Sequence, residues 1–161
     1  MKHVKLDKTD LKILKELQQN GRITNVDLAK IADISAPPCL RRVRTLENAG
    51  FIRGYHADVA ADKLGYGITI FVQASLTNHT ETDLNNFTKH MEGLPQVREC
   101  YLMTGDSDFL LKVVAEDWEA FQKFLTNLLS NIGNIQHVKS SPVMRRMKFM
   151  PGVPIEDTKK D

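Results

Sequence analysis

The chain has 161 residues, 42% of them hydrophobic and 26% charged, a balance typical of one ordinary globular domain or two small ones and not of a disordered chain. No apolar run approaches the roughly 20 residues of a transmembrane helix, no secretory signal is evident and only two cysteines occur, so we expect a cytoplasmic protein without membrane partners. The net charge of +2 combines +5 over residues 1–54 with −3 over residues 55–161, which predicts an anionic partner for the first half.

Three helix starts are predicted in the basic half, each from a short oxygen-bearing side chain flanked by apolar residues. These capping residues are Asp7, Thr24 and Ser35. The spacing predicts helices over about 8–20 and 25–32, and a third helix from Ser35 to Gly50. Because only a tight turn separates the last two, residues 1–54 are predicted to form a helix-turn-helix domain of winged-helix-like type.

The third predicted helix carries three arginines within four positions. At about 100° per residue, its buried face is predicted to hold Cys39, Leu40, Val43 and Leu46, with the arginines on or beside the opposite face. A charged helix face is usually only solvated, but such a face would interleave glutamates with the arginines. We therefore predict contacts to DNA phosphates and base edges from this region. The predicted DNA-binding residues are Asn25, Ser35, Pro37, Pro38, Arg41, Arg42, Arg44 and Thr45.

The segment that follows, FIRGYHADV, alternates enough to predict a strand or a small β-wing. Two glycines in AADKLGYG then favour a hinge. Residues 55–66 are accordingly predicted to be a wing strand and linker.

The acidic half repeats a β-α-β pattern. Strands are predicted over 67–76, 97–103, 109–115 and 135–150, with a helix capped by Thr80 after the first and a helix over 118–133 after the third. The whole chain is thus predicted to be α+β, with residues 67–161 forming a ferredoxin-like βαββαβ domain of four antiparallel strands and both helices on one face.

The other face of the predicted sheet needs a partner. It would carry some of the apolar residues Phe71, Tyr101, Leu110 and Val113, and an identical sheet in a homodimer is the natural cover. In a dimer, the third helix of each subunit would also face one half of a palindromic site in double-stranded DNA.

Three segments together resemble the Lrp/AsnC family of prokaryotic transcription regulators, most of all its leucine-responsive branch. They are LDKTDLKILKELQQNGRITNVDLAK, PPCLRRVRTLENAGFIRGY and ECYLMTGDSDFLLKV, which occur in this order and extend the resemblance over nearly the whole chain. The resemblance implies sequence-specific regulation of amino-acid metabolism, modulated by a free, leucine-like amino acid bound at an inter-subunit site. It also implies dimers that assemble further, commonly into octamers.

The family's effector loop has the pattern Gly-Asp-x-Asp-aromatic, which is similar to residues 105–109. Gly and Asp by themselves favour a plain hairpin turn. A carboxylate also suits the α-ammonium of an amino acid, and backbone N–H groups near glycine suit its carboxylate. The resemblance implies effector-binding residues Gly105, Asp106, Ser107, Asp108 and Phe109, completed by Ser140 and Ser141. Phe109 stands where Tyr is frequent and Ser107 where larger residues are common, so the preferred amino acid stays open.

Nothing in the sequence predicts catalysis, a cofactor or a metal. The five histidines lack ligand spacing, Cys39 and Cys100 are far apart, and no phosphate-binding glycine motif or nucleophile elbow occurs. Two alternatives stay open: an architectural DNA-binding protein without effector, and an enzyme similar to the siroheme decarboxylases, which resemble this fold. Such an enzyme has no use for an arginine-bearing DNA helix.

Overall fold

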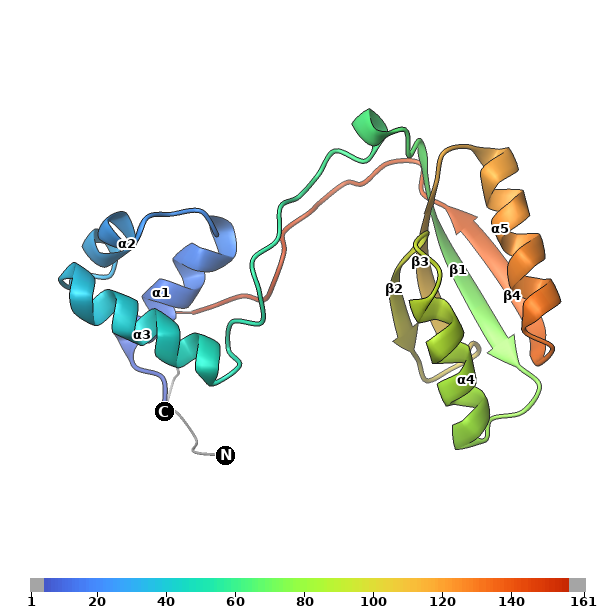
Figure 1. The fold of residues 1–161 in the computed structure, drawn as a ribbon, viewed down its shortest axis with the longest axis horizontal. Helices are drawn as coiled ribbons and strands as arrows, with labels where there is room; N and C mark the ends of the chain where they lie inside the picture. Colours follow the sequence, from blue (N-terminus) through green and yellow to red (C-terminus); the bar gives the residue numbers. More distant parts are fainter. Residues whose placement is uncertain (1–4, 157–161) are drawn as a thin grey trace. The chain divides into compact units, whose positions relative to one another are not determined.

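The computed structural model describes residues 5–156, which divide into two compact units (Figure 1). The first unit holds the described residues up to Asp58 together with those from Lys148 onward, and the second is Val59–Met147. Each unit has a hydrophobic core of its own. The predicted boundaries at residues 54 and 66 stay predictions, and residues 148–156 group with the first unit although they follow the second in sequence.

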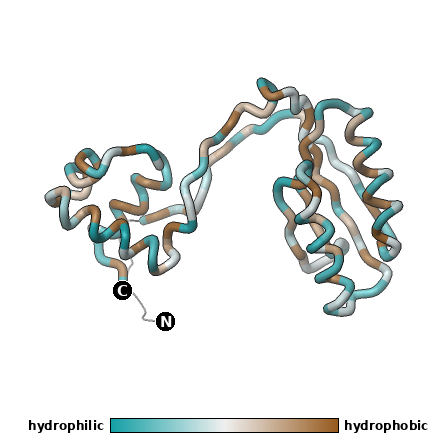
Figure 2. Tube along the Cα trace, in the orientation of Figure 1, coloured by the Kyte–Doolittle hydropathy of each residue, from teal (hydrophilic) through white to brown (hydrophobic). Residues whose placement is uncertain are grey.

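The first unit contains three helices, α1 (Lys8–Gln19), α2 (Asn25–Ile31) and α3 (Ala36–Asn48). Two of the predicted caps are confirmed. Asp7 forms a complete capping box with Asp10, and the Thr24 side chain accepts a hydrogen bond from the Asp27 N–H. The fully buried core comprises Ile13, Leu28, Ala29, Ala32, Cys39 and Leu46. In Figure 2 the helices alternate between hydrophilic and hydrophobic colour along their length, as amphipathic helices do.

Ser35 is the N-cap residue of α3 as predicted, but its side chain does not make the predicted capping hydrogen bond. A capping oxygen accepts from the N–H of the second or third helical residue. In α3 these residues are Pro37 and Pro38, which have no N–H. The Ser35 hydroxyl is therefore not used by its own helix.

The predicted wing strand is also wrong, since none of residues 51–59 is in a strand. A strand needs a neighbouring strand to pair with, and the sheet of residues 5–156 contains only β strands that follow this segment. The linker contains a short 3₁₀ helix, η1 (Asp62–Leu64), which ends at Gly65 with a left-handed φ of 88°. Only glycine adopts such a conformation without strain.

The second unit confirms the ferredoxin-like prediction. Its elements are β1 (Ile68–Leu76), α4 (Glu81–Glu92), β2 (Val97–Leu102), β3 (Phe109–Ala115), α5 (Trp118–Asn131) and β4 (Ile135–Pro142). The antiparallel strands lie in the order β2-β3-β1-β4. Thr80 caps α4 as predicted, and Gly93 ends it.

Alternating burial along β1 and β3 shows which face the two helices cover. On β3 every second residue from Phe109 to Ala115 is buried, in the same core as Phe87 of α4 and Phe121 of α5. Val113 belongs to this buried set, so its predicted place on the uncovered face is wrong and Val114 lies there instead. The single-residue difference reverses the face, because successive strand residues point to opposite sides.

The last strand is shorter than predicted, since β4 ends at Pro142 and not at residue 150. Proline has no N–H for a further ladder bond, and a backbone hydrogen bond from Val143 N–H to the Thr69 carbonyl follows the last strand residue. No helix of residues 5–156 is long and apolar enough to cross a membrane.

Candidate functional site

One face of α3 is exposed along its whole length. Its residues follow the spacing i, i+3, i+4, i+7, i+8 and i+11, and we call them the α3 stripe: Pro37, Leu40, Arg41, Arg44, Thr45 and Asn48. The predicted burial of Leu40 is wrong, because 40% of the residue is exposed in the middle of this stripe. An exposed leucine beside two arginines can contact a thymine methyl group in the major groove. Leu40 and Asn48 are thus candidate contacts that the sequence prediction missed.

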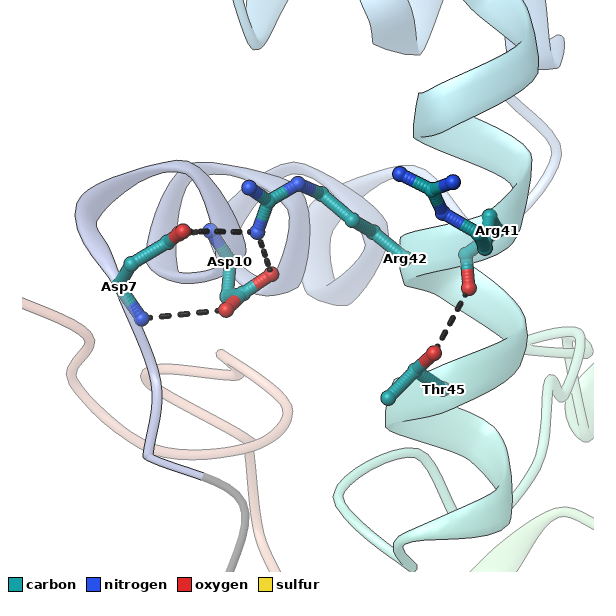
Figure 3. A network of polar contacts seen from close by, with 5 residues as sticks. All are labelled: Asp7, Asp10, Arg41, Arg42 and Thr45. Carbon is teal, nitrogen blue, oxygen red and sulfur yellow. Dashed lines mark hydrogen bonds and ion pairs between the residues drawn. The ribbon is translucent and has the colours of Figure 1, made fainter.

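Arg42 faces away from the stripe and toward α1. Its Nη1 donates to Asp7 Oδ2 and to Asp10 Oδ1, both at 2.8 Å (Figure 3). Only 11% of the Asp10 side chain and 34% of the Arg42 side chain are exposed. The prediction that all three arginines are uncompensated is therefore wrong for Arg42, which connects α3 to the start of α1. Within residues 5–156 the guanidinium groups of Arg41 and Arg44 have no such partner.

The Asp7 carboxylate is held in its charged form by the same network. It accepts a hydrogen bond from the Asp10 backbone N–H at 2.8 Å and a second from Arg42. These contacts, the backbone bond first, lower the pKa of Asp7. Asp7 therefore contributes stability above the carboxylate's ordinary titration range and loses it as the pH falls through the lowered pKa.

Asn25, predicted only as a DNA contact, also has a structural role. Its side-chain amide nitrogen donates to the Ala36 carbonyl at 2.8 Å, which links the first residue of α2 to the first residue of α3. Asp33, in the turn between these helices, has a left-handed φ of 56°. Its carboxylate pairs with Lys12 of α1. Polar contacts thus link α2 to α3 and the turn to α1.

The second candidate site is the loop that joins β2 to β3, residues 103–108. The loop is closed by a hydrogen bond from Met103 N–H to the Asp108 carbonyl at 2.8 Å. Gly105 has a φ of 124°, which favours glycine, and a Cβ placed there would meet open space. The backbone of the loop is thus free to approach a ligand closely.

The two predicted carboxylates of this loop have different surroundings. Asp108 is 21% exposed, and its Oδ2 accepts from the Leu76 N–H at 2.7 Å and lies 2.9 Å from His79 Nε2. Asp106 is exposed, and within the described residues only its carbonyl accepts a hydrogen bond, from the Ser75 hydroxyl at 3.4 Å. Asp108 is therefore the fixed carboxylate of the loop. Ser107, between them, is half-buried.

The side chain of Phe109 does not face the loop. It is 1% exposed and stacks on Phe87 of α4, with ring centroids 4.1 Å apart. Within one chain this ring does not line the loop, and the predicted effector-binding role of Phe109 stays a prediction. The ring instead anchors the end of the loop in the core, where its large buried area stabilises the start of β3.

Ser140 and Ser141 are not beside the loop within one chain. They pair with Val72 and Phe71, so Ser140 is on the helix-covered face of the sheet and Ser141 is on the other. The β4 residue opposite Ser75, at the loop end of β1, is His137. At about 3.3 Å per residue, Ser140 and Ser141 lie roughly 10 Å or more farther along the strand. Their predicted role stays a prediction.

Comparisons with known families match both units. The Lrp/AsnC ligand binding domain family matches residues 69–153. The winged helix-turn-helix DNA-binding family matches residues 6–53. The match to the winged helix-turn-helix family covers the α3 stripe, and the match to the ligand binding domain family covers the loop at 103–108.

Individual relatives are similar over nearly the full chain. A leucine-responsive regulatory protein of Rhizobium meliloti is 46% identical to this chain over 90% of this chain and 93% of the relative. A Bkd operon transcriptional regulator of Pseudomonas aeruginosa is 39% identical over 93% of this chain and 98% of the relative. Among solved structures, a Neisseria meningitidis transcriptional regulator in complex with L-methionine has a TM-score of 0.88 at 35% identity, covering 93% of this chain and 97% of that one. AsnC of Escherichia coli has a TM-score of 0.80 at 28% identity, covering 96% and 100%.

Proposed function

The chain belongs to the Lrp/AsnC family of transcription regulators, and from that membership we propose which residues carry out its regulatory task. It is a transcription regulator that combines a DNA-binding helix-turn-helix with an amino-acid-binding domain. We propose that the α3 stripe contacts double-stranded DNA and that the loop at 103–108 binds the effector. The observation that carries the first assignment is the continuous exposure of the stripe, with two arginines in it that have no ion-pair partner among the described residues.

The chemistry of the stripe supports major-groove recognition. Arg41 and Arg44 can donate bidentate hydrogen bonds to guanine or pair with phosphates. The Thr45 hydroxyl donates to the Arg41 carbonyl at 2.9 Å, so its oxygen is left as an acceptor. The Ser35 hydroxyl makes no capping hydrogen bond and can therefore donate to a DNA phosphate. Pro37 and Pro38, which follow it, have short side chains that allow the DNA to approach closely. Arg42 and Asn25 are assigned to holding α3 in place and not to DNA.

Arg44→Ala is expected to weaken DNA binding about tenfold and to reduce the slope of log affinity against log salt by about 1, because one cation leaves the interface. The measurement is fluorescence anisotropy with duplexes that the wild-type chain selects from a random-sequence pool. Arg98→Ala, which removes an exposed arginine of β2, is the control and should match the wild type. Wild-type affinity and salt slope in Arg44→Ala would remove Arg44 from the interface.

The effector we propose is a free amino acid with an apolar side chain, of the leucine or methionine class. One relative is named leucine-responsive and a solved relative holds L-methionine, which supports this class. In the loop, the Asp108 carboxylate would accept hydrogen bonds from the α-ammonium, and N–H groups near Gly105 would donate to the α-carboxylate.

We also propose a dimer through the uncovered face of the sheet, with further assembly to an octamer. This face presents Phe71, Leu110 and Val114, and Tyr101 lies opposite Leu110 on the neighbouring strand. Two of its charged groups are paired with each other, since Lys112 Nζ lies 2.6 Å from a Glu99 oxygen. The apolar side chains of this face suit burial against a second copy.

Leu110→Glu is expected to reduce the assembled mass to that of a smaller species, because it would bury two uncompensated carboxylates in a two-fold interface. Size-exclusion chromatography with light scattering measures the mass directly. Leu129→Glu, at an exposed position of α5 on the helix side of the sheet, is the matched control. If Leu110→Glu assembles as the wild type does, the interface lies elsewhere.

A further inference from the structure

Both partners of the Asp108 carboxylate meet the same oxygen. The Leu76 N–H donates to Oδ2 at 2.7 Å, and His79 Nε2 lies 2.9 Å from that atom. Because the partner is an acceptor, Nε2 is assigned as the N–H of the imidazole. Among residues 5–156, no hydrogen bond reaches Oδ1. Oδ1 is therefore the acceptor that remains for a ligand.

His79 is held at this position by the turn that carries it. The turn joins β1 to α4, and its residues 77 and 78 are hydrogen-bonded to Asn134, the residue before β4. Thr77 N–H donates to the Asn134 carbonyl at 2.9 Å, and Asn78 N–H donates to the Asn134 side-chain oxygen at 3.2 Å. The residue after His79, Thr80, caps α4. The backbone on both sides of His79 is thus constrained, and its ring is directed to the loop.

The exposure of His79 argues against a role in the core. Its side chain is 58% exposed, so it buries little apolar surface and its removal should cost little stability. A solvated group can still fix the direction of a neighbour, because a hydrogen bond to a charged acceptor is stronger than one between neutral groups. The contact between His79 and Asp108 is therefore better explained by a role in positioning the carboxylate than by a contribution to the stability of the fold.

We propose that His79 is a positioning residue for effector binding. Together with the Leu76 N–H it holds Oδ2 of Asp108, so that Oδ1 is presented to the α-ammonium of the bound amino acid. This inference rests on the proposed function, in which the loop at 103–108 binds that amino acid. Without His79, one hydrogen bond remains on the carboxylate, which can then turn about its side-chain bonds and must be ordered when the ligand binds.

The test is isothermal titration calorimetry of the full chain with L-leucine and with L-methionine. His79→Ala is expected to raise the Kd about fivefold, the value of one modest hydrogen bond, and to leave the melting temperature without amino acid unchanged. His79→Gln should bind within about twofold of the wild type, because its amide nitrogen supplies a donor near the place of Nε2. His90→Ala is the control, about 14 Å farther along α4 by helix geometry.

Hydrogen exchange of the Leu76 amide gives a second measurement without ligand. We expect faster exchange in His79→Ala and wild-type exchange in His79→Gln. Wild-type Kd in His79→Ala, or a His79→Gln variant as weak as His79→Ala, overturns the inference and leaves the effector site standing. A wild-type chain that binds neither amino acid overturns the effector site and the inference with it.

Discussion

Arg42→Ala is expected to lower the free energy of unfolding of the first unit by about 2–3 kcal/mol. Asp10 is buried, and its Oδ1 accepts a hydrogen bond from Arg42 at 2.8 Å. Removal of the guanidinium leaves this carboxylate in the core without a compensating charge. Breaking a buried pair costs about 3–5 kcal/mol, and partial exposure of Arg42 reduces the effect because solvent screens the interaction.

The stability of the first unit can be measured separately from that of the second by hydrogen exchange of amides in α1 and α3. Arg41→Ala is the matched control, because it removes a neighbouring arginine that has no carboxylate partner within residues 5–156. Arg41→Ala should leave the exchange of these amides unchanged. Equal protection in the two variants would mean that the contact of Arg42 with α1 contributes no stability.

A double-mutant cycle identifies Asp10 as the source of the effect. In an Asp10→Asn background the cost of Arg42→Ala should fall to about 1 kcal/mol or less, because no buried charge is then left alone. DNA binding adds a second criterion. At a temperature where the first unit stays folded, Arg42→Ala should keep the wild-type salt slope, whereas Arg44→Ala should not. A reduced slope in Arg42→Ala would make Arg42 a phosphate contact after all.

Asp108→Asn is expected to weaken the binding of L-leucine or L-methionine at least about 30-fold, because a charged acceptor for the ammonium is replaced by a neutral one. The substitution keeps the size of the side chain and one oxygen that can accept from the Leu76 N–H. The loop should therefore keep its conformation. Isothermal titration calorimetry measures the loss, and the melting temperature without ligand should change little.

Two further substitutions show whether the loss of affinity is specific to the Asp108 carboxylate. Asp106→Asn should weaken binding only about threefold, because Asp106 is exposed and solvent screens its charge. Glu92→Gln, which removes an exposed carboxylate at the end of α4, should have no effect. If Asp106→Asn is as damaging as Asp108→Asn, the fixed carboxylate is not the main partner of the ammonium. Wild-type affinity in Asp108→Asn would place the effector elsewhere.

The predictions that succeeded depend on interactions between residues close in sequence. Thr24 and Thr80 cap their helices because the bond partner is three residues away, and alternation within β1 decides its buried face. The missing capping hydrogen bond at Ser35 has a local cause as well, since two prolines remove the N–H groups that the bond needs. Local chemistry also explains the early end of β4 at Pro142.

The order of the elements, the two-unit fold and the resemblance to the family were determined by the sequence itself, through caps, periodicity and motif spacing. Which arginine of α3 meets solvent was decided by the tertiary structure. Adjacent helical residues differ by about 100° in direction, so the rotation of α3 about its axis selects Arg41 and Arg44 over Arg42. That rotation is set by the packing of Cys39 and Leu46 in the core and by the contact of Arg42 with Asp10, which lies 32 positions away in the sequence. Helical periodicity carries no information over that distance.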